Sequence, residues 1–451
     1  MSNEREQSPP VDLVGMTPAG LDSLPLRIAR RLFAADVIFT SGRLANLLPD
    51  TFQAKIRVWP TPFDALLDEM EELREAGKRI AVIATGDPLH FGVGATLRQR
   101  FSMEDMRVWP APSAFSLAAA RLGWPLEETV ALSLHGRSPA CIERYLCNNA
   151  RLLVLTDATS LPQVCARLKR RGLDDTRITL LANLDGDEER VLSLSVQEAE
   201  QISEELRQMP HVLALECRLS EQAARAGRMP LPLAAGLPDD AFAHDGQITK
   251  APMRAITVSA LCPRPHAILW DIGAGCGSVA IEWLRLAGPA AHAVAVEQNE
   301  SRARLIAQNA DVLGTPRLRI VTGKAPEALR SLPAPNAVFI GGGLRNDDIF
   351  KAAWEALKPG GVLVANAVSL AGEAALLARH AEMGGELMRF STSMAAPLVS
   401  PQSAAQTPPE DEEEQTQELA GVAEAPAGLS GAPQAFRPAF SVTQWRIRKP
   451  W

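Results

Sequence analysis

The chain has 451 residues, 46% hydrophobic and 22% charged, which is typical of a soluble globular protein of two or three domains. Its 46 Lys+Arg and 53 Asp+Glu give a net charge of −7, so we expect no nucleic-acid partner. No apolar run is long enough to span a membrane and the amino terminus lacks an apolar core, which predicts a cytoplasmic protein without membrane contact. The six cysteines form no C-x-x-C pair and the seven histidines lack metal-ligand spacing, so we expect no metal site.

The first half of the chain alternates short β-branched runs with amphipathic stretches, after a predicted disordered tail at 1–10. Such alternation predicts an α/β fold with helices covering both faces of a sheet. The predicted strands lie at 11–15, 36–40, 79–85, 150–157, 176–183 and 211–217.

Residues 230–248 carry several prolines and no periodicity, which predicts a domain boundary between 235 and 236. A second α/β series follows in the predicted domain 236–451. Its predicted strands lie within 266–275, 291–299, 318–325, 336–343 and 361–368.

Residues 400–435 differ from both series, because five consecutive acids occur among Ala, Pro, Gln and Gly. Such a segment buries too little apolar surface to offset its ordering entropy, so we predict a disordered acidic insertion. Strand-like segments flank it, which places the insertion inside a hairpin. A solvated spacer without a function of its own is the simplest interpretation.

A glycine turn in the second domain is the most specific local signal, since DIGAGCGS follows an apolar strand and precedes an amphipathic helix. Glycines let the backbone approach a ligand closely. A dinucleotide-binding turn would have a glycine at position 278, where this chain has Ser278. The G-x-G-x-G spacing from Gly273 through Ala274, Gly275, Cys276 and Gly277 therefore favours S-adenosylmethionine.

Two further strand ends agree with a nucleoside site. Glu297 ends the next strand, where a carboxylate can accept both ribose hydroxyls. Ala325 follows the third strand, where a small residue leaves room for adenine. A tight turn that binds nothing is the alternative for the glycine turn taken alone.

The segment ITKAPMRAITVSALCPRPHAILWDIGAGCGSVAIEW resembles the C15-methyltransferase family of the cobalamin pathway, whose members are class I S-adenosylmethionine-dependent enzymes. The resemblance runs from about 246 to the end and implies a Rossmann-like domain with a mixed seven-stranded sheet. It also implies cofactor contacts from Thr249, from the turn 273–277, from Glu297 and from Ala325. Residues 340–343 and Asn366 would border a tetrapyrrole. One departure is Asn336, where relatives usually have Asp.

The first domain has a second turn, Thr85-Gly86-Asp87-Pro88, after an apolar strand. A single Asp without an acidic partner is a poor Mg²⁺ site. On residue chemistry alone, Asp87 is predicted to accept an N–H from Leu89 or His90 in a polar turn.

GDPLHFGVGATL, PSAFSLAAARLGWP and LSLHGR resemble the tetrapyrrole methylase superfamily, in particular its C5-methylating member, over 11–235. That resemblance implies two α/β subdomains with S-adenosylmethionine between them. Residues 16–20 depart from the usual G-x-G-P-G, which leaves direct contacts from that loop open, and His135 and Arg137 are either site residues or polar groups at a strand end. The implied cofactor residues are Gly86, Asp87, Pro88, Ser113, Ala114 and Ser116.

The fused arrangement resembles the precorrin-6Y C5,C15-methyltransferase (decarboxylating) family, which implies two methylations of precorrin-6Y, loss of the C12 acetate carboxyl and formation of precorrin-8X. The catalytic residues remain unknown, and we expect a homo-oligomer. Arg43, Arg254 and Arg264 are candidates to pair with substrate carboxylates, although a surface arginine is the favoured interpretation of each, because the chain has 46 Lys+Arg. An RNA methyltransferase and a nucleotide-sensing Rossmann protein without chemistry remain as alternatives.

Overall fold

The computed structural model describes residues 8–60, 63–228, 230–397 and 434–451. The chain divides into two compact units, residues 1–230 and 231–451. Most of the predicted tail (1–7) and of the predicted acidic insertion (400–433) lies outside the described residues. No helix among the described residues is long and apolar enough to cross a membrane.

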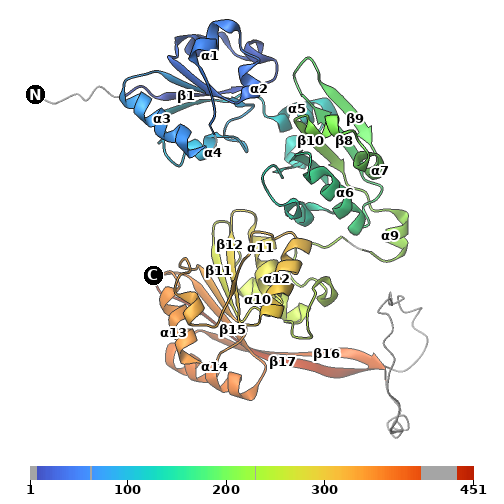
Figure 1. Ribbon diagram of the computed structural model, residues 1–451. Helices are drawn as coiled ribbons and strands as arrows, with labels where there is room; N and C mark the ends of the chain where they lie inside the picture. Colours follow the sequence, from blue (N-terminus) through green and yellow to red (C-terminus); the bar gives the residue numbers. More distant parts are fainter. Residues whose placement is uncertain (1–7, 61–62, 229, 398–433) are drawn as a thin grey trace, which may run out of the picture. The chain divides into compact units, whose positions relative to one another are not determined.

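The first subdomain of unit 1 (Figure 1) is a parallel sheet in the order β3-β2-β4-β1-β5. Apolar side chains lie on both faces of this sheet. Helix α3 covers one face through Leu66 and Met70, and helix α1 covers the other through Ile28 and Leu32. The elements are β1 (Val11–Met16), α1 (Leu26–Ala34), β2 (Val37–Thr40), α2 (Gly42–Ala45), β3 (Ile56–Val58), α3 (Asp64–Glu75), β4 (Ile80–Thr85), α4 (Gly94–Leu97) and β5 (Met106–Trp109).

The second subdomain of unit 1 is a mixed sheet in the order β6-β7-β10-β8-β9, parallel at β6·β7 and antiparallel elsewhere. Helix α5 packs on one face through Phe115, and helix α6 packs on the other through Val164 and Leu168. The elements are α5 (Ala114–Leu122), β6 (Val130–Ser133), β7 (Arg151–Thr156), α6 (Ser160–Arg170), β8 (Arg177–Ala182), β9 (Arg190–Leu194), α7 (Val196–Glu200), α8 (Glu204–Gln208), β10 (His211–Glu216) and α9 (Glu221–Arg225). The two predicted α/β subdomains are confirmed.

Unit 2 contains the predicted mixed seven-stranded sheet, in the order β13-β12-β11-β14-β15-β17-β16. The first five strands run parallel, and β17 pairs antiparallel with both β15 and β16. The strands are β11 (Ile268–Ile272), β12 (His292–Glu297), β13 (Arg319–Thr322), β14 (Ala337–Ile340), β15 (Val362–Ala367), β16 (Glu386–Pro397) and β17 (Gln434–Arg448). Since β16 and β17 pair from Pro397↔Gln434 onward, the predicted hairpin around the acidic segment is confirmed.

Helices cover both faces of this sheet (Figure 1). Alternate strand residues divide between two cores, with Leu269 packing toward α10, α11 and α12, and Trp270 packing toward α13 and α14. The helices are α10 (Ala251–Ala260), α11 (Ser278–Ala287), α12 (Glu300–Val312), α13 (Asp347–Ala356) and α14 (Leu370–Met383).

The proline-rich segment that predicted a boundary packs onto unit 2 instead of standing free. Leu237 and Phe242 are only 1% and 3% exposed and belong to the core beneath α10 and α11. The backbone of this segment is held by side chains of the unit, because Ala243 N donates to Asn309 Oδ1 at 2.8 Å. We call residues 231–250 the strap.

Candidate functional site

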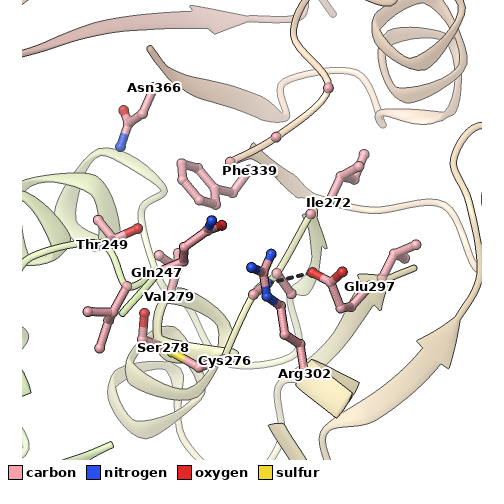
Figure 2. Close-up of a pocket in the computed structure, with 18 of the residues that line it drawn as sticks. Gln247, Thr249, Ile272, Cys276, Ser278, Val279, Glu297, Arg302, Phe339 and Asn366 are labelled. Carbon is pink, nitrogen blue, oxygen red and sulfur yellow. Dashed lines mark hydrogen bonds between the residues drawn. The ribbon is translucent and has the colours of Figure 1, made fainter. Parts of the chain in front are cut away.

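The cavity of unit 2 has a volume of about 920 Å³ and lies at the carboxyl ends of the parallel strands. The strand order reverses at β11, since β12 and β14 lie on its two sides, and such a switch point leaves a crevice for a ligand. Figure 2 shows Thr249, Cys276 and Glu297 around this space. The other predicted residues that line it are Gly273, Ala274, Gly275, Ala325, Asn366 and residues 341–343.

A different physical constraint favours glycine at each of the three glycine positions of the turn. Gly273 has φ +72°, and a Cβ there would lie 3.0 Å from Gly342 N, so the turn and the loop after β14 approach each other closely. Gly275 has φ +59° and faces the cavity, with only Gln247 O near a hypothetical Cβ, at 3.6 Å. Gly277 does not line the cavity, since its Cβ position lies 2.8 Å from Ile306, and it allows α11 to pack on α12.

Glu297 is 5% exposed and joins the ends of two strands. Its Oε2 accepts from Gly275 N and its Oε1 accepts from Asn299 N, both at 2.9 Å. Each carboxylate oxygen has a second lone pair, so these bonds leave acceptors for hydroxyl groups in the cavity. The glycine turn and the acid, predicted separately, are therefore parts of one hydrogen-bonded structure.

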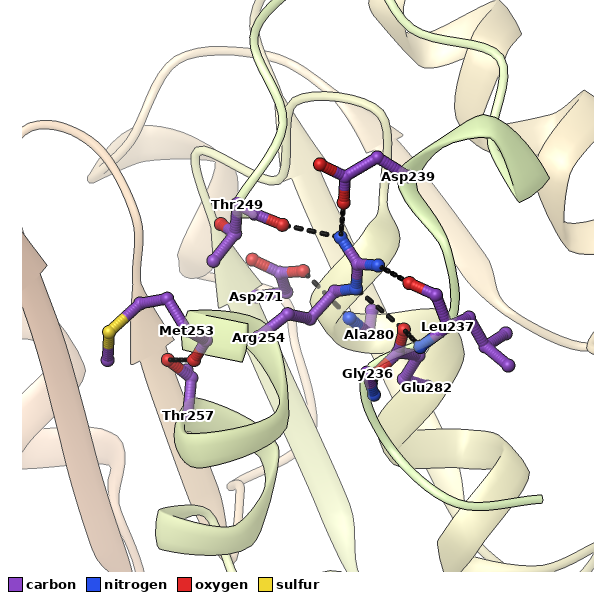
Figure 3. A network of polar contacts seen from close by, with 10 residues as sticks. All are labelled: Gly236, Leu237, Asp239, Thr249, Met253, Arg254, Thr257, Asp271, Ala280 and Glu282. Atoms are coloured by element: carbon purple, nitrogen blue, oxygen red, sulfur yellow. Dashed lines mark hydrogen bonds and ion pairs between the residues drawn. The ribbon is translucent and has the colours of Figure 1, made fainter. Parts of the chain in front are cut away.

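Arg254 is fully buried, so the prediction of a surface arginine or a clamp is wrong for it. Its Nε donates to Glu282 Oε1 at 2.6 Å and its Nη1 donates to Asp239 Oδ1 at 3.0 Å (Figure 3). It also donates to the carbonyl oxygens of Leu237 and Thr249. Arg254 therefore holds the middle of the strap at Leu237 and Asp239 and its carboxyl-terminal part at the cavity residue Thr249.

Two other residues of unit 2 that were named from the sequence lie outside the cavity lining, and two cations that were not named lie in it. Arg264 is exposed and is absent from the cavity lining. Asn336 accepts from Ile268 N through Oδ1 at 2.9 Å, a structural role at a strand start. Lys324 and Arg345, which were not predicted, line the cavity as exposed cations.

Asp271 is the fourth of the five residues of strand β11, and its carboxyl group is buried. Its Oδ2 accepts from Ala280 N at 3.1 Å, whereas Oδ1 has no hydrogen-bond partner among the described residues. Burial raises the pKa of Asp271 from 3.8 to about 7, and the charge of Glu297 adds to this rise. The charged form is therefore unfavourable in the folded chain.

We predict that Asp271→Asn stabilises unit 2 at alkaline pH. Because the folded pKa of Asp271 lies above its unfolded value, the folded state binds the proton more tightly, and stability falls as pH rises from about 4 to 7. The asparagine cannot ionise, so its advantage in free energy of unfolding should grow across this window, by up to about 4 kcal/mol. Urea unfolding at pH 5 and pH 8 measures it; an advantage equal at both pH values would contradict the prediction.

The cavity of unit 1 has a volume of about 440 Å³ and is lined by both of its subdomains. The predicted residues Gly86, Asp87, Ser113 and Ala114 line it, and so does His135. Pro88 and Ser116 do not line it, and Arg137 lies over the ring of Phe91, 5.1 Å from its centroid.

Hydrogen bonds fix two turns of unit 1, of which only the turn at Asp87 was predicted. Leu89 N donates to Asp87 Oδ1 at 2.9 Å, which confirms the polar turn. Ser113 caps α5, since its Oγ accepts from Ser116 N at 3.1 Å, and this bond explains the place of Ser116 outside the cavity. Gly86 has φ +64°, and a Cβ there would lie 3.1 Å from Pro112 O, so these two turns lie close together.

The loop after β1, where direct contacts were left open, reaches the cavity through Thr17 and Pro18. Thr17 Oγ1 donates to Asp185 Oδ2 at 2.5 Å and so bridges the two subdomains. Asp185 has φ +67° in the turn after β8. Neither residue carries a sequence signal that predicts this bond.

Comparison with known proteins identifies both units as methyltransferase domains. Residues 11–200 match the family of tetrapyrrole (corrin/porphyrin) methylases, and residues 240–409 match the precorrin methyltransferase domain family. The crystal structure of the C-terminal domain of precorrin-6Y C5,15-methyltransferase from Rhodobacter capsulatus is 38% identical, covers 49% of this chain and 100% of that chain, and has a TM-score of 0.39.

Two full-length relatives carry the same name, precorrin-6Y C(5,15)-methyltransferase (decarboxylating). The one from Sinorhizobium sp is 41% identical over 443 residues, which is 98% of this chain and 97% of the relative. The one from Mycobacterium tuberculosis is 35% identical over 442 residues, which is 97% of this chain and 99% of the relative. With this identity over nearly its whole length, the chain belongs to the precorrin-6Y C5,15-methyltransferase (decarboxylating) family.

Proposed function

We propose that this chain methylates precorrin-6Y at C5 and at C15 and removes the carboxyl group of its C12 acetate, giving precorrin-8X in cobalamin biosynthesis. The observation that carries the proposal is the 41% identity over 98% of the chain to a relative of that name. The two separate cavities, one in each unit, support a division into C5 methylation in residues 11–235 and C15 methylation with decarboxylation in 236–451. The cytoplasmic location and the homo-oligomer stay predictions.

We further propose that S-adenosylmethionine is the methyl donor in both units. In unit 2 the glycine turn offers a cradle that a side chain at Gly275 would fill, and Glu297 offers free lone pairs beside it. The residues proposed to contact the donor there are Thr249, Gly273, Ala274, Gly275, Cys276, Glu297 and Ala325, with Gly277 in a supporting position. In unit 1 they are Gly86, Asp87, Ser113 and Ala114, with Pro88 and Ser116 in supporting positions.

The proposed chemistry requires little from the side chains beyond positioning. The bound donor supplies a sulfonium methyl group, and the enamine-like carbon of the reduced macrocycle attacks this methyl in line as the C–S bond breaks. Holding the two reactants in this geometry accounts for much of the acceleration in such displacements. In unit 2, Glu297 and the turn at 273–277 would orient the donor, while Lys324 and Arg345 would attract the carboxylates of the macrocycle.

The direct test is incubation of the full chain with isotope-labelled S-adenosylmethionine and precorrin-6Y, followed by mass spectrometry. A gain of two labelled methyl groups with loss of carbon dioxide is expected. The absence of transfer to the macrocycle contradicts the proposal. Transfer to an RNA added in parallel would favour the RNA methyltransferase, and donor binding without any transfer would favour the nucleotide sensor.

Glu297→Gln tests the proposed donor site of unit 2. A glutamine offers an acceptor oxygen to only one of the two N–H groups of Gly275 and Asn299, and it loses the charge that strengthens bonds to ribose hydroxyls. We expect the KM for S-adenosylmethionine in C15 methylation to rise by ~10-fold or more. Methylation at C5 should be unchanged, as should both reactions in the control Glu300→Gln, an exposed residue of α12. An unaltered KM would remove Glu297 from the site.

A further inference from the structure

Arg43 lines the cavity of unit 1 and has no carboxylate partner among the described residues. It belongs to the short helix α2, which follows strand β2 (Figure 1). Its Nη2 donates to Thr85 Oγ1 at 3.1 Å, which uses one of the five N–H donors of the guanidinium group. The remaining donors are available to a ligand.

Three other arginines of the same subdomain are paired with carboxylates. Arg31 contacts Asp12 at 3.5 Å, Arg79 contacts Asp36 at 3.1 Å, and Arg100 contacts Glu71 at 2.7 Å. Arg43 differs from these three, because its polar partner among the described residues is a hydroxyl group and not a carboxylate; the residue is exposed to the cavity, and partial desolvation lowers the pKa of its guanidinium group. A guanidinium group stays charged under such conditions, so Arg43 is an uncompensated positive charge in the cavity wall.

The rest of the cavity wall favours an anionic ligand beside Arg43. Among the described lining residues Asp87 is the only carboxylate, and its Oδ1 accepts from Leu89 N. Two hydroxyl groups share the cavity lining with Arg43: Thr85 contacts its guanidinium group, and Ser41 is the N-cap residue of α2, two positions before it. Thr85 accepts its Nη2, and Ser41 Oγ accepts from Leu44 N, so each hydroxyl proton is free to be donated.

We propose that Arg43, with the hydroxyl groups of Ser41 and Thr85, forms a carboxylate-binding subsite in the cavity of unit 1. This proposal rests on the proposed function, whose two substrates both carry carboxylates: the side chains of the macrocycle and the methionine moiety of the donor. The planar guanidinium fork suits a carboxylate, which it binds through two parallel N–H···O bonds. Thr85 directly precedes Gly86, so a carboxylate held here lies beside the turn proposed to contact the donor.

The test uses the full chain with Arg43→Gln, Arg43→Lys and the control Arg30→Gln, which changes an exposed arginine of α1 outside the cavity lining. For Arg43→Gln we expect the KM of one substrate in C5 methylation to rise by ~10-fold or more, with a smaller change in kcat. Arg43→Lys should recover part of this loss, because it restores the charge without the fork. Arg30→Gln should leave both KM values unchanged.

The substrate whose KM changes identifies the source of the carboxylate. A higher KM for the macrocycle assigns the subsite to a macrocycle side chain, and a higher KM for S-adenosylmethionine assigns it to the methionine carboxylate. Unchanged KM values for both substrates overturn the subsite, as does an equal loss in Arg30→Gln. C15 methylation by the same variant is the internal reference. If the proposed function is wrong, the unaltered chain transfers no methyl group to the macrocycle. If only the subsite proposal is wrong, the unaltered chain is active and the KM values of Arg43→Gln are unchanged.

Discussion

Gly275→Leu is expected to abolish methylation at C15 and decarboxylation while methylation at C5 continues. The leucine would have to adopt φ +59°, a backbone conformation that residues other than glycine rarely adopt. Its branches would also extend into the 920 Å³ cavity where we place the donor. We expect the C15 rate to fall by at least ~100-fold, about 2.7 kcal/mol of transition-state stabilisation. Mass spectrometry of the macrocycle should then show a single added methyl group.

The matched control is Gly288→Ala, at another glycine of unit 2. Gly288 has φ +90°, nothing lies within 4 Å of its Cβ position, and it is not part of the cavity lining. This variant carries the backbone strain without filling the cavity, so C15 methylation should persist. Two results would refute the placement of the donor: retained C15 methylation in Gly275→Leu, or its loss in Gly288→Ala as well. Loss of C5 methylation in Gly275→Leu would show that the two units do not react independently.

Arg254→Met is expected to destabilise unit 2 by about 3–5 kcal/mol, because it leaves Glu282 buried without its counter-ion. The side chains of Arg254 and Glu282 are 0% and 1% exposed, so water cannot replace the lost partner. The variant also releases the carbonyl oxygens of Leu237 and Thr249. Hydrogen exchange of peptides from α11, measured against denaturant concentration, reports the change, with peptides from β7 in unit 1 as the reference.

The control for this variant is Arg330→Met, which removes an exposed arginine of the same unit and should change the free energy of unfolding by less than ~0.5 kcal/mol. If Arg254 positions the strap, Arg254→Met should also raise the KM for the donor in C15 methylation under conditions where unit 2 remains folded. Arg254→Lys should recover only part of either loss, because an ammonium group cannot reach all four acceptors at once. Unaltered exchange in α11 would rule out this role of the ion pair.

The central strands could be predicted from sequence because both of their faces are buried. The strands β4, β11 and β15 are almost wholly buried and most of their residues are apolar, which is typical of parallel strands covered by helices on both sides. The edge strands β3, β5 and β9 were not predicted. Their residues are mostly exposed or half-buried, so they lack the apolar pattern by which a strand is recognised.

The strap shows a second reason why the structure differs from what the sequence pattern indicates. Its prolines and missing periodicity are typical of a linker, yet its backbone N–H groups at Gly236 and Leu237 donate to Glu282, at 2.6 and 2.9 Å. Irregular backbone can be buried wherever side chains satisfy it, and no local pattern reveals those partners. The segment therefore packs with unit 2, which begins at residue 231, and the predicted boundary between 235 and 236 falls within it.

The α/β class, the strand-turn-helix units and the glycine turns follow from the sequence alone, because each depends on residues that are neighbours along the chain. The sequence also placed Glu297 and Gly275 at strand ends, and parallel strands bring such ends to one edge of a sheet. Only the tertiary structure decided which polar groups meet. Arg254 and Glu282 are 28 positions apart, and Thr17 and Asp185 are 168 apart. Such pairs form because burial makes an unpaired charge or hydroxyl costly, and the packing of whole subdomains selects the partner.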